Sequence, residues 1–188
     1  MLIKIPEERV AVLVGRNGYV KKLIERNLHV KLHINSETGN VSIDVAEGFE
    51  DPSLLFKAKD VVLAIGRGFS PDHAFTLLND VDKVLEIIDL RMVFGKSPSN
   101  FKRVKGRIIG RSGKTRQRIE ESSDAFVSVY GHTIAIIGGI QEVEVARQAI
   151  KLLIQGKEHK TVYRYLQKQR HELKKKNFVL WKEYAVKD

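Results

Sequence analysis

Two short loops, each with a glycine at both ends, carry the clearest chemical signal in this chain. They are Gly15-Arg16-Asn17-Gly18 and Gly110-Arg111-Ser112-Gly113. Because glycine has no Cβ, another backbone can approach such a loop closely. A helix that starts directly after the loop directs its free N–H groups and the positive end of its dipole toward the same place, which favours phosphate. The two loops therefore predict phosphate binding, and the arginine in each adds positive charge.

The charge of the chain supports a polyanionic ligand. The net charge is +10 and the isoelectric point is about 9.7, which favours nucleic acid or an anionic membrane surface. Residues 102–118, around the second loop, contain eight Lys or Arg and no acid, whereas the equivalent window 7–23 has a balance of only +2. Since phosphate contacts dominate affinity for nucleic acids, the second loop is predicted to provide most of the affinity for a nucleic acid.

The predicted nucleic-acid-binding residues surround both loops. Around the second loop they are Lys105, Arg107, Gly110, Arg111, Ser112, Gly113, Lys114 and Arg116; around the first they are Gly15, Arg16, Asn17, Gly18 and Lys21. Tyr19 follows the first loop and is a candidate for base stacking, with local packing as the alternative. Ile108, Ile109 and Ile119 are candidates for apolar base contacts, although we expect their main role to be core packing.

The loops belong to an internal repeat. Residues 15–25 recur as 110–120, with five of eleven positions identical, and an apolar pair precedes each loop. A repeat with this spacing indicates duplication of a whole small domain and not a solenoid, whose units are about 20–50 residues long. One glycine-bracketed loop is weak evidence, because many such loops simply connect two helices. Two loops at matching points of matching units predict a shared function.

Hydrophobic periodicity predicts the same order of elements in both copies. The first copy has a strand at 2–5, helices at 7–14 and 18–27, strands at 30–34 and 41–45, and a helix at 52–65. The second has a strand at 84–90, a helix from 98 to the loop, a helix at 115–122, strands at 126–130 and 133–137, and a helix at 140–154. Each unit is therefore of the α+β class, with the loop between its first two helices.

A basic tail follows the second unit. Residues 157–188 have a net charge of +6. One predicted side of a helix carries Val162, Tyr165, Leu166, Gln169 and Leu173, and another stripe carries Phe178, Trp181, Tyr184 and Ala185. One interpretation is a helix that packs on the second unit with its basic face in solvent. The other is a tail that docks on RNA or on a ribosomal protein.

The residues around both loops resemble the core signature of type I KH domains, which clamp about four nucleotides of backbone with this loop. The segments that carry the resemblance are 14–18 and 108–115. It implies two tandem type I KH domains of order β-α-α-β-β-α, each with a three-stranded antiparallel sheet and helices on one face, plus a C-terminal helical tail. The implied domains are 1–78 and 79–156, with the extension at 157–188.

A wider resemblance covers nearly the whole chain. Residues 64–71, 74–78, 106–110, 146–150 and 156–163 are similar to the partner-of-Nob-one (Dim-type) and KRR-type ribosome-assembly proteins, in the compact archaeal form. This resemblance implies binding of small-subunit (16S) rRNA or pre-rRNA near its 3′ end. The implied protein partners are pre-ribosomal proteins, an rRNA-processing nuclease or a translation initiation factor. In eukaryotic members the first loop is usually degenerate, whereas both loops are intact here.

Other classes of protein fit less well. Gly113-Lys114-Thr115 resembles the end of a Walker A loop, but the glycine required at position 108 is Ile. The chain has no cysteine, and we find no set of His and carboxylates with metal-ligand spacing. We therefore predict no catalytic residues, no metal, no cofactor, no membrane segment and a cytoplasmic location. The alternative is an RNA-binding subunit of another machine, such as an exosome cap or a translation-initiation accessory factor. A pure protein scaffold is the third possibility.

Overall fold

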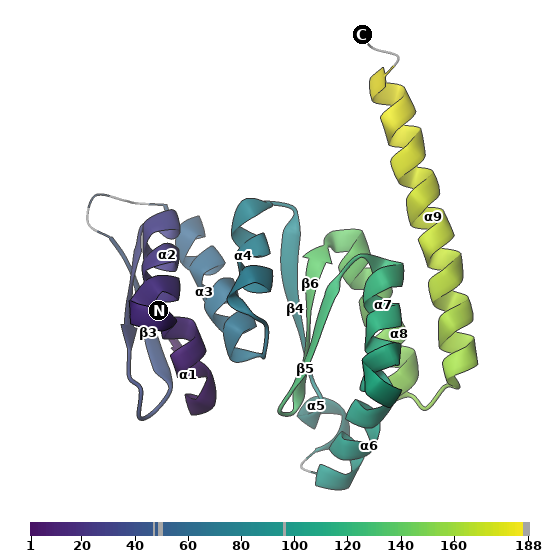
Figure 1. The fold of residues 1–188 in the computed structure, drawn as a ribbon, viewed down its shortest axis with the longest axis horizontal. Coiled ribbons are helices and arrows are strands. Elements are labelled where there is room, and N and C mark those ends of the chain that lie inside the picture. Colours follow the sequence, from purple (N-terminus) through teal and green to yellow (C-terminus); the bar gives the residue numbers. More distant parts are fainter. Residues whose placement is uncertain (47, 49–50, 96, 186–188) are drawn as a thin grey trace.

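The computed structural model describes residues 1–46, 48, 51–95 and 97–185, with side chains of the last helix described up to 173 and at 175. The chain forms two αβ units followed by a long helix (Figure 1). Within these ranges, no helix is both long and apolar enough to cross a membrane.

The first unit has the predicted order of elements and one additional helix. Its elements are β1 (Leu2–Lys4), α1 (Glu7–Val14), the 3-10 turn η1 (Arg16–Gly18), α2 (Tyr19–Leu28), β2 (Val30–Ile34), β3 (Asn40–Val45) and α3 (Pro52–Gly66). The sheet is antiparallel in the order β1-β3-β2. The additional helix, α4 (Pro71–Asn79), begins where the Ser70 hydroxyl accepts from the backbone N–H of His73 at 3.4 Å.

The second unit repeats this arrangement. Its elements are β4 (Lys83–Asp89), the short α5 (Arg91–Phe94), α6 (Pro98–Ile109), η2 (Arg111–Gly113), α7 (Lys114–Ser123), β5 (Phe126–Tyr130), β6 (Thr133–Gly139) and α8 (Ile140–Ile154). The sheet order, β4-β6-β5, is that of the first unit, so β2 and β5 are equivalent edge strands. The predicted helices and strands agree with these elements to within two residues at each end.

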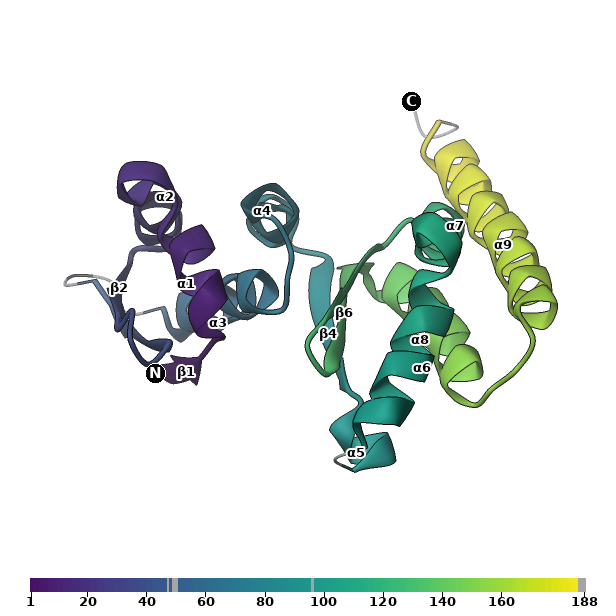
Figure 2. The ribbon, with the colours of Figure 1, turned by 60° about the horizontal axis from the view of Figure 1, so that its bottom comes forward.

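The two units pack against each other across the second sheet. Helices α6, α7 and α8 cover the inner face of that sheet, and its outer face lies toward the first unit (Figures 1 and 2). Ala135 and Ile137 of β6 are fully buried in the hydrophobic core of the first unit, and Phe126 packs at its border. Because both faces of β6 are covered, its first six residues are all buried. The continuous apolar run in this strand was the sequence signal for a sheet enclosed on both sides.

Polar contacts hold the two units in register. The Arg9 guanidinium donates to the carbonyls of Ile65 at 2.8 Å and Phe69 at 2.5 Å, and it lies over the ring of Tyr130, 5.8 Å from the centroid. The Tyr130 hydroxyl donates to the carboxylate of Glu8. Burial, followed by this hydrogen bond, raises the pKa of Tyr130 above its ordinary value. Arg9 thus joins α1, the end of α3 and β5.

The last helix, α9 (His159–Ala185), packs its first half on the second unit. Val162 and Leu166 are buried in the second core, and Tyr165 and Leu173 pack at its border. The Arg118 guanidinium lies 4.4 Å from the centroid of the Tyr163 ring. The predicted apolar side of the tail is therefore confirmed. The second predicted stripe, from Phe178 to Ala185, lies outside the described side chains.

Candidate nucleic-acid interface

The two glycine-bracketed loops have the same backbone conformation. Gly15 has φ 71° and ψ 175°, and Gly110 has φ 72° and ψ 178°. The third residue of each loop, Asn17 or Ser112, has φ 52°. Each loop makes a 3-10 turn and leads directly into a helix, so the N-terminal N–H groups of α2 and α7 lie next to the loop. Both loops therefore place backbone N–H groups at the start of a helix, a geometry that favours anions.

The first glycine of each loop is required by its backbone and by its neighbours. The combination of φ near 70° and ψ near 180° is accessible essentially only to glycine. A Cβ on Gly110 would lie 2.2 Å from Thr115 Oγ1, and one on Gly15 would lie 2.5 Å from Val20 Cγ2. The helix that follows each loop can pack this closely only because the side chain is absent.

The charged side chains nearest the loops differ in how they are held. Arg16, Arg111 and Lys114 are exposed, and no ion pair or hydrogen bond engages their side chains within the described part of the chain. Lys21 pairs with Glu25 at 3.8 Å, and Arg116 pairs with Glu120 at 3.7 Å, each one helical turn away. The exposed cations are those best placed to meet a phosphate over the loop.

Two of the predicted RNA-binding side chains are directed toward the protein itself. Lys105 Nζ donates to the carbonyl of Gly131 at 2.8 Å. Arg107 donates to the carbonyls of Leu153 at 3.3 Å and of Lys157, which ties α6 to the end of α8. Both side chains therefore make hydrogen bonds within the protein, and their charges add to the local positive potential.

A glutamate at equivalent positions of the repeat ties the second helix of each unit to its edge strand. The Glu25 carboxylate accepts from the N–H of Leu32 at 2.9 Å, and the Glu120 carboxylate accepts from the N–H of Val127 at 2.8 Å. We did not predict this role from the sequence. The signal was present, because this glutamate is one of the five identical positions in the repeat.

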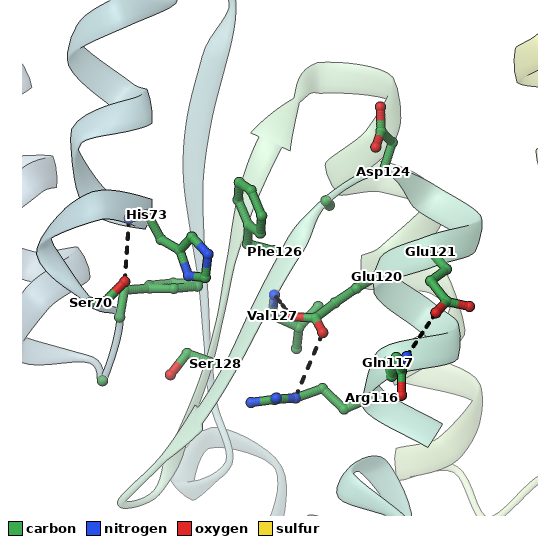
Figure 3. Close-up of a pocket in the computed structure, with 13 residues that line it drawn as sticks. Ser70, His73, Arg116, Gln117, Glu120, Glu121, Asp124, Phe126, Val127 and Ser128 are labelled. Atoms are coloured by element: carbon green, nitrogen blue, oxygen red, sulfur yellow. Dashed lines mark hydrogen bonds and ion pairs between the residues drawn. The ribbon is translucent and has the colours of Figure 1, made fainter. Parts of the chain in front are cut away.

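The apolar candidates separate into buried and exposed residues. Ile108 and Ile119 are fully buried, as expected for core residues, while Ile109 is 37% exposed. Tyr19 is 64% exposed and lines a groove of about 660 Å³ beside the first loop, together with Phe75 of α4. A second groove, of about 530 Å³, lies between α7 and β5 and reaches the first unit (Figure 3).

The described residues contain no cluster of three or more His, Cys, Asp or Glu that could hold a metal ion. The loops and their surroundings offer positive charge, backbone N–H donors and aromatic surface. These groups can bind a sugar-phosphate chain and stack on bases.

Two family models together match nearly the whole chain. A model described as a eukaryotic type KH-domain (KH-domain type I) matches residues 84–171, and the Krr1 KH1 domain matches residues 2–80. The chain is 43% identical to a KH domain-containing protein of Methanocaldococcus jannaschii, over 100% of this chain and 81% of that protein. It is 30% identical to the pre-rRNA-processing protein pno1 of Schizosaccharomyces pombe, over 86% of this chain and 67% of that protein.

A solved structure is also similar. It is the a/eIF2alpha-aDim2p-rRNA complex from Pyrococcus horikoshii OT3, one chain of which matches with a TM-score of 0.84 and 49% identity, over 92% of this chain and 94% of that chain.

Proposed function

This chain belongs to the Dim2/PNO1 family of KH-domain RNA-binding proteins, and on that premise we propose that it binds single-stranded small-subunit rRNA or pre-rRNA near its 3′ end during ribosome assembly. The family consists of RNA-binding, pre-rRNA-processing proteins and not of enzymes, as the sequence predicted. The α+β class with two KH units and a C-terminal helix is likewise confirmed.

The observation that carries the proposal is the second loop. Gly113, at the end of the loop, has open space where a Cβ would lie, so a phosphate backbone can approach it closely, and Arg111 and Lys114 are exposed beside the start of α7. Phosphates of the RNA lie over residues 110–113, and the positive charges of these side chains and of Arg116 attract them. Lys105 and Arg107 contribute mainly through their positive charge, because hydrogen bonds to backbone carbonyls hold both side chains against the protein.

The first loop is the weaker site in this proposal. It has the same geometry, and Arg16, Asn17, Gly18 and Lys21 are its contact residues, but its surroundings carry less positive charge. Since a related aDim2p was crystallised with both rRNA and a/eIF2alpha, we assign the initiation factor as a protein partner. Pre-ribosomal proteins and an rRNA-processing nuclease are further candidates. We also propose that the chain divides into domains between residues 78 and 79 and between residues 156 and 157, and that the protein is cytoplasmic.

Fluorescence anisotropy with a labelled strand that matches the 3′ end of small-subunit rRNA tests the proposal. The proteins are the wild type, Arg111→Asp/Ser112→Asp and the matched Arg16→Asp/Asn17→Asp, each at two salt concentrations. We expect the second-loop variant to lose roughly tenfold to a hundredfold in affinity and to show a flatter salt dependence, because phosphate contacts are lost. The first-loop variant loses less. If both variants bind like the wild type and remain folded, the KH loops are not the RNA site.

A further inference from the structure

The groove between α7 and β5 is built by both KH units. The second unit contributes Arg116, Gln117 and Glu120 from α7 and residues 124–128 on and before β5. The first unit contributes Gly68, Phe69, Ser70 and His73, which precede or begin α4. Figure 3 shows His73 and Ser70 on one side of β5, and Arg116, Gln117 and Glu120 on the other. The edge strand of the second unit is thus the floor between two walls that come from different units.

This groove lies next to the proposed phosphate clamp. Arg116 is in the first turn of α7, three residues after Gly113 at the end of the loop. A strand whose phosphates rest on residues 110–113 therefore passes the mouth of the groove within one helical turn, and a base that turns inward enters it.

The wall from the first unit is aromatic. The imidazole of His73 stacks on the ring of Phe126, with centroids 4.2 Å apart and an interplanar angle of 19°. The Phe69 ring meets His73 edge-on at 6.4 Å. Phe69 is buried, whereas His73 is exposed. Exposed aromatic and histidine rings are the surfaces on which single-stranded RNA bases stack. Across the groove, α7 presents the guanidinium of Arg116, which pairs with Glu120 at 3.7 Å, and the amide of Gln117, which donates to Glu121 at 2.9 Å. The remaining N–H groups of Arg116 and the side-chain carbonyl of Gln117 can meet the polar edge of a base.

The position of this wall is fixed before RNA binds. Arg9 holds the carbonyls of Ile65 and Phe69, and the Ser128 hydroxyl donates to the carbonyl of Arg67 at 2.8 Å. A Cβ on Gly68 would lie 2.7 Å from Ser128 Oγ, so the absence of a side chain lets this segment rest directly on β5. A preformed wall lowers the ordering cost of binding.

We propose that one nucleobase of the bound RNA occupies this composite groove, stacked on the His73–Phe126 pair with its polar edge facing α7. The first KH unit thereby takes part in base recognition at the binding site of the second. The proposal rests on the RNA-binding function above and adds a specific side chain, His73, from outside the second unit.

An abasic scan tests the proposal. Each nucleotide of the labelled strand is replaced in turn by an abasic one, and affinities are measured for the wild type, His73→Ala, His73→Phe and the control His33→Ala. His33 is an exposed histidine on the equivalent edge strand of the first sheet. We expect the wild type to lose roughly tenfold at one position or more, because a stacked base is removed. We expect His73→Ala to bind the intact RNA roughly tenfold more weakly than the wild type does. At one of the sensitive positions, an abasic nucleotide should then cause no further loss of affinity for His73→Ala.

The other variants separate stacking from folding. His73→Phe keeps an aromatic surface and is expected to retain most of the affinity, and His33→Ala is expected to bind like the wild type. Thermal unfolding checks that each variant is folded. If His73→Ala matches the wild type across the whole scan while Arg111→Asp/Ser112→Asp is defective, the composite groove is wrong and the proposed function stands. If the loop variant also binds normally, the proposed function itself fails. If His73→Ala weakens binding only of the a/eIF2alpha-type partner, the groove is a protein site and the proposal is overturned.

Discussion

The two KH units have the same loop but different surroundings. Their backbone angles at the first glycine agree to within a few degrees, and each uses a glutamate of the second helix to hold its edge strand. The balance of charge around the loop is +8 in the second unit and +2 in the first. The duplicated loop therefore predicts the same phosphate site in both units, and the neighbouring side chains predict tighter binding at the second one.

The outer faces of the two sheets differ even more. In the first sheet, Lys31, His33 and Asp44 are exposed on that face. In the second, Ala135 and Ile137 are fully buried against the first unit. The first unit covers the outer face of the second sheet. Among the described residues, no segment covers the outer face of the first sheet in the same way. The asymmetry means that the first unit covers one face of the second sheet and lines the groove beside β5.

Gly110→Ala is expected to have the largest effect, because it changes the backbone of the second glycine-bracketed loop. The new Cβ would lie 2.2 Å from Thr115 Oγ1, in a backbone region that other residues rarely adopt. We expect a loss of about 2–4 kcal/mol in the free energy of unfolding and loss of most RNA affinity, measured by urea unfolding and anisotropy.

Gly113→Ala is the matched control for this change. Gly113 also has positive φ, at 79°, but its Cβ would meet open space. We expect a cost of about 1 kcal/mol. Equal losses at Gly110 and Gly113 would show that contact with α7 is not what constrains the loop.

Gly68→Ala tests the contact between the units. Its Cβ would lie 2.7 Å from Ser128 Oγ and 2.9 Å from Tyr130 Cβ, so the segment must move away from β5. We expect a loss of about 1–3 kcal/mol in stability and a weaker loss of RNA affinity through the groove. Gly131→Ala is the control, since Gly131 has φ 56° and open space around its Cβ. If Gly68→Ala and Gly131→Ala lose the same stability relative to the wild type, the loss comes from backbone strain at positive φ and not from the contact between the units.

Tyr19→Lys makes the first loop more like the second, where Lys114 occupies the equivalent position. In the Arg111→Asp/Ser112→Asp background, we expect affinity to rise a few-fold and the salt slope to steepen by about one, because one phosphate contact is added. Tyr19→Gln removes the ring without adding charge. If Tyr19→Lys does not bind more tightly than Tyr19→Gln, RNA does not lie over the first loop.

Asp60→Asn is expected to have the smallest effect. Burial raises the pKa of Asp60 above its ordinary value, and the equivalent residue of α8 is the uncharged Gln148. Because the folded pKa is higher than the unfolded one, the stability contribution of Asp60 is complete at low pH and is lost as pH rises through the folded pKa. At pH 7 we expect the substitution to raise Tm by about 1–2 °C.

The pH dependence identifies the cause of that gain. Below about pH 3, Asp60 is protonated in both states, so the gain should disappear. Asp82→Asn, at an exposed position in the loop before β4, should leave Tm unchanged. A gain that persists unchanged at low pH would rule out the buried charge as its origin.

Local patterns were enough to predict most of the fold. Glycine spacing, alternating strands and helical periodicity located both KH units, because these signals act between residues a few positions apart. Helix α4 was missed even though Ser70 and Pro71 form a readable helix start. The apolar run of β6 is typical of a strand covered on both faces, which we did not predict, and the run does not identify the segment that covers the second face.

The sequence by itself determined the two loops, the order of the elements that the two KH units share and the excess of charge at the second loop. Only the tertiary structure decided which charges remain available there: Arg111 and Lys114 stay exposed, whereas Arg107 is bonded to carbonyls about 50 residues away. It also decided that His73, from the first unit, stands beside β5 of the second. The physical reason is that backbone conformation follows from neighbours along the chain, while the partners of a side chain depend on how distant segments pack.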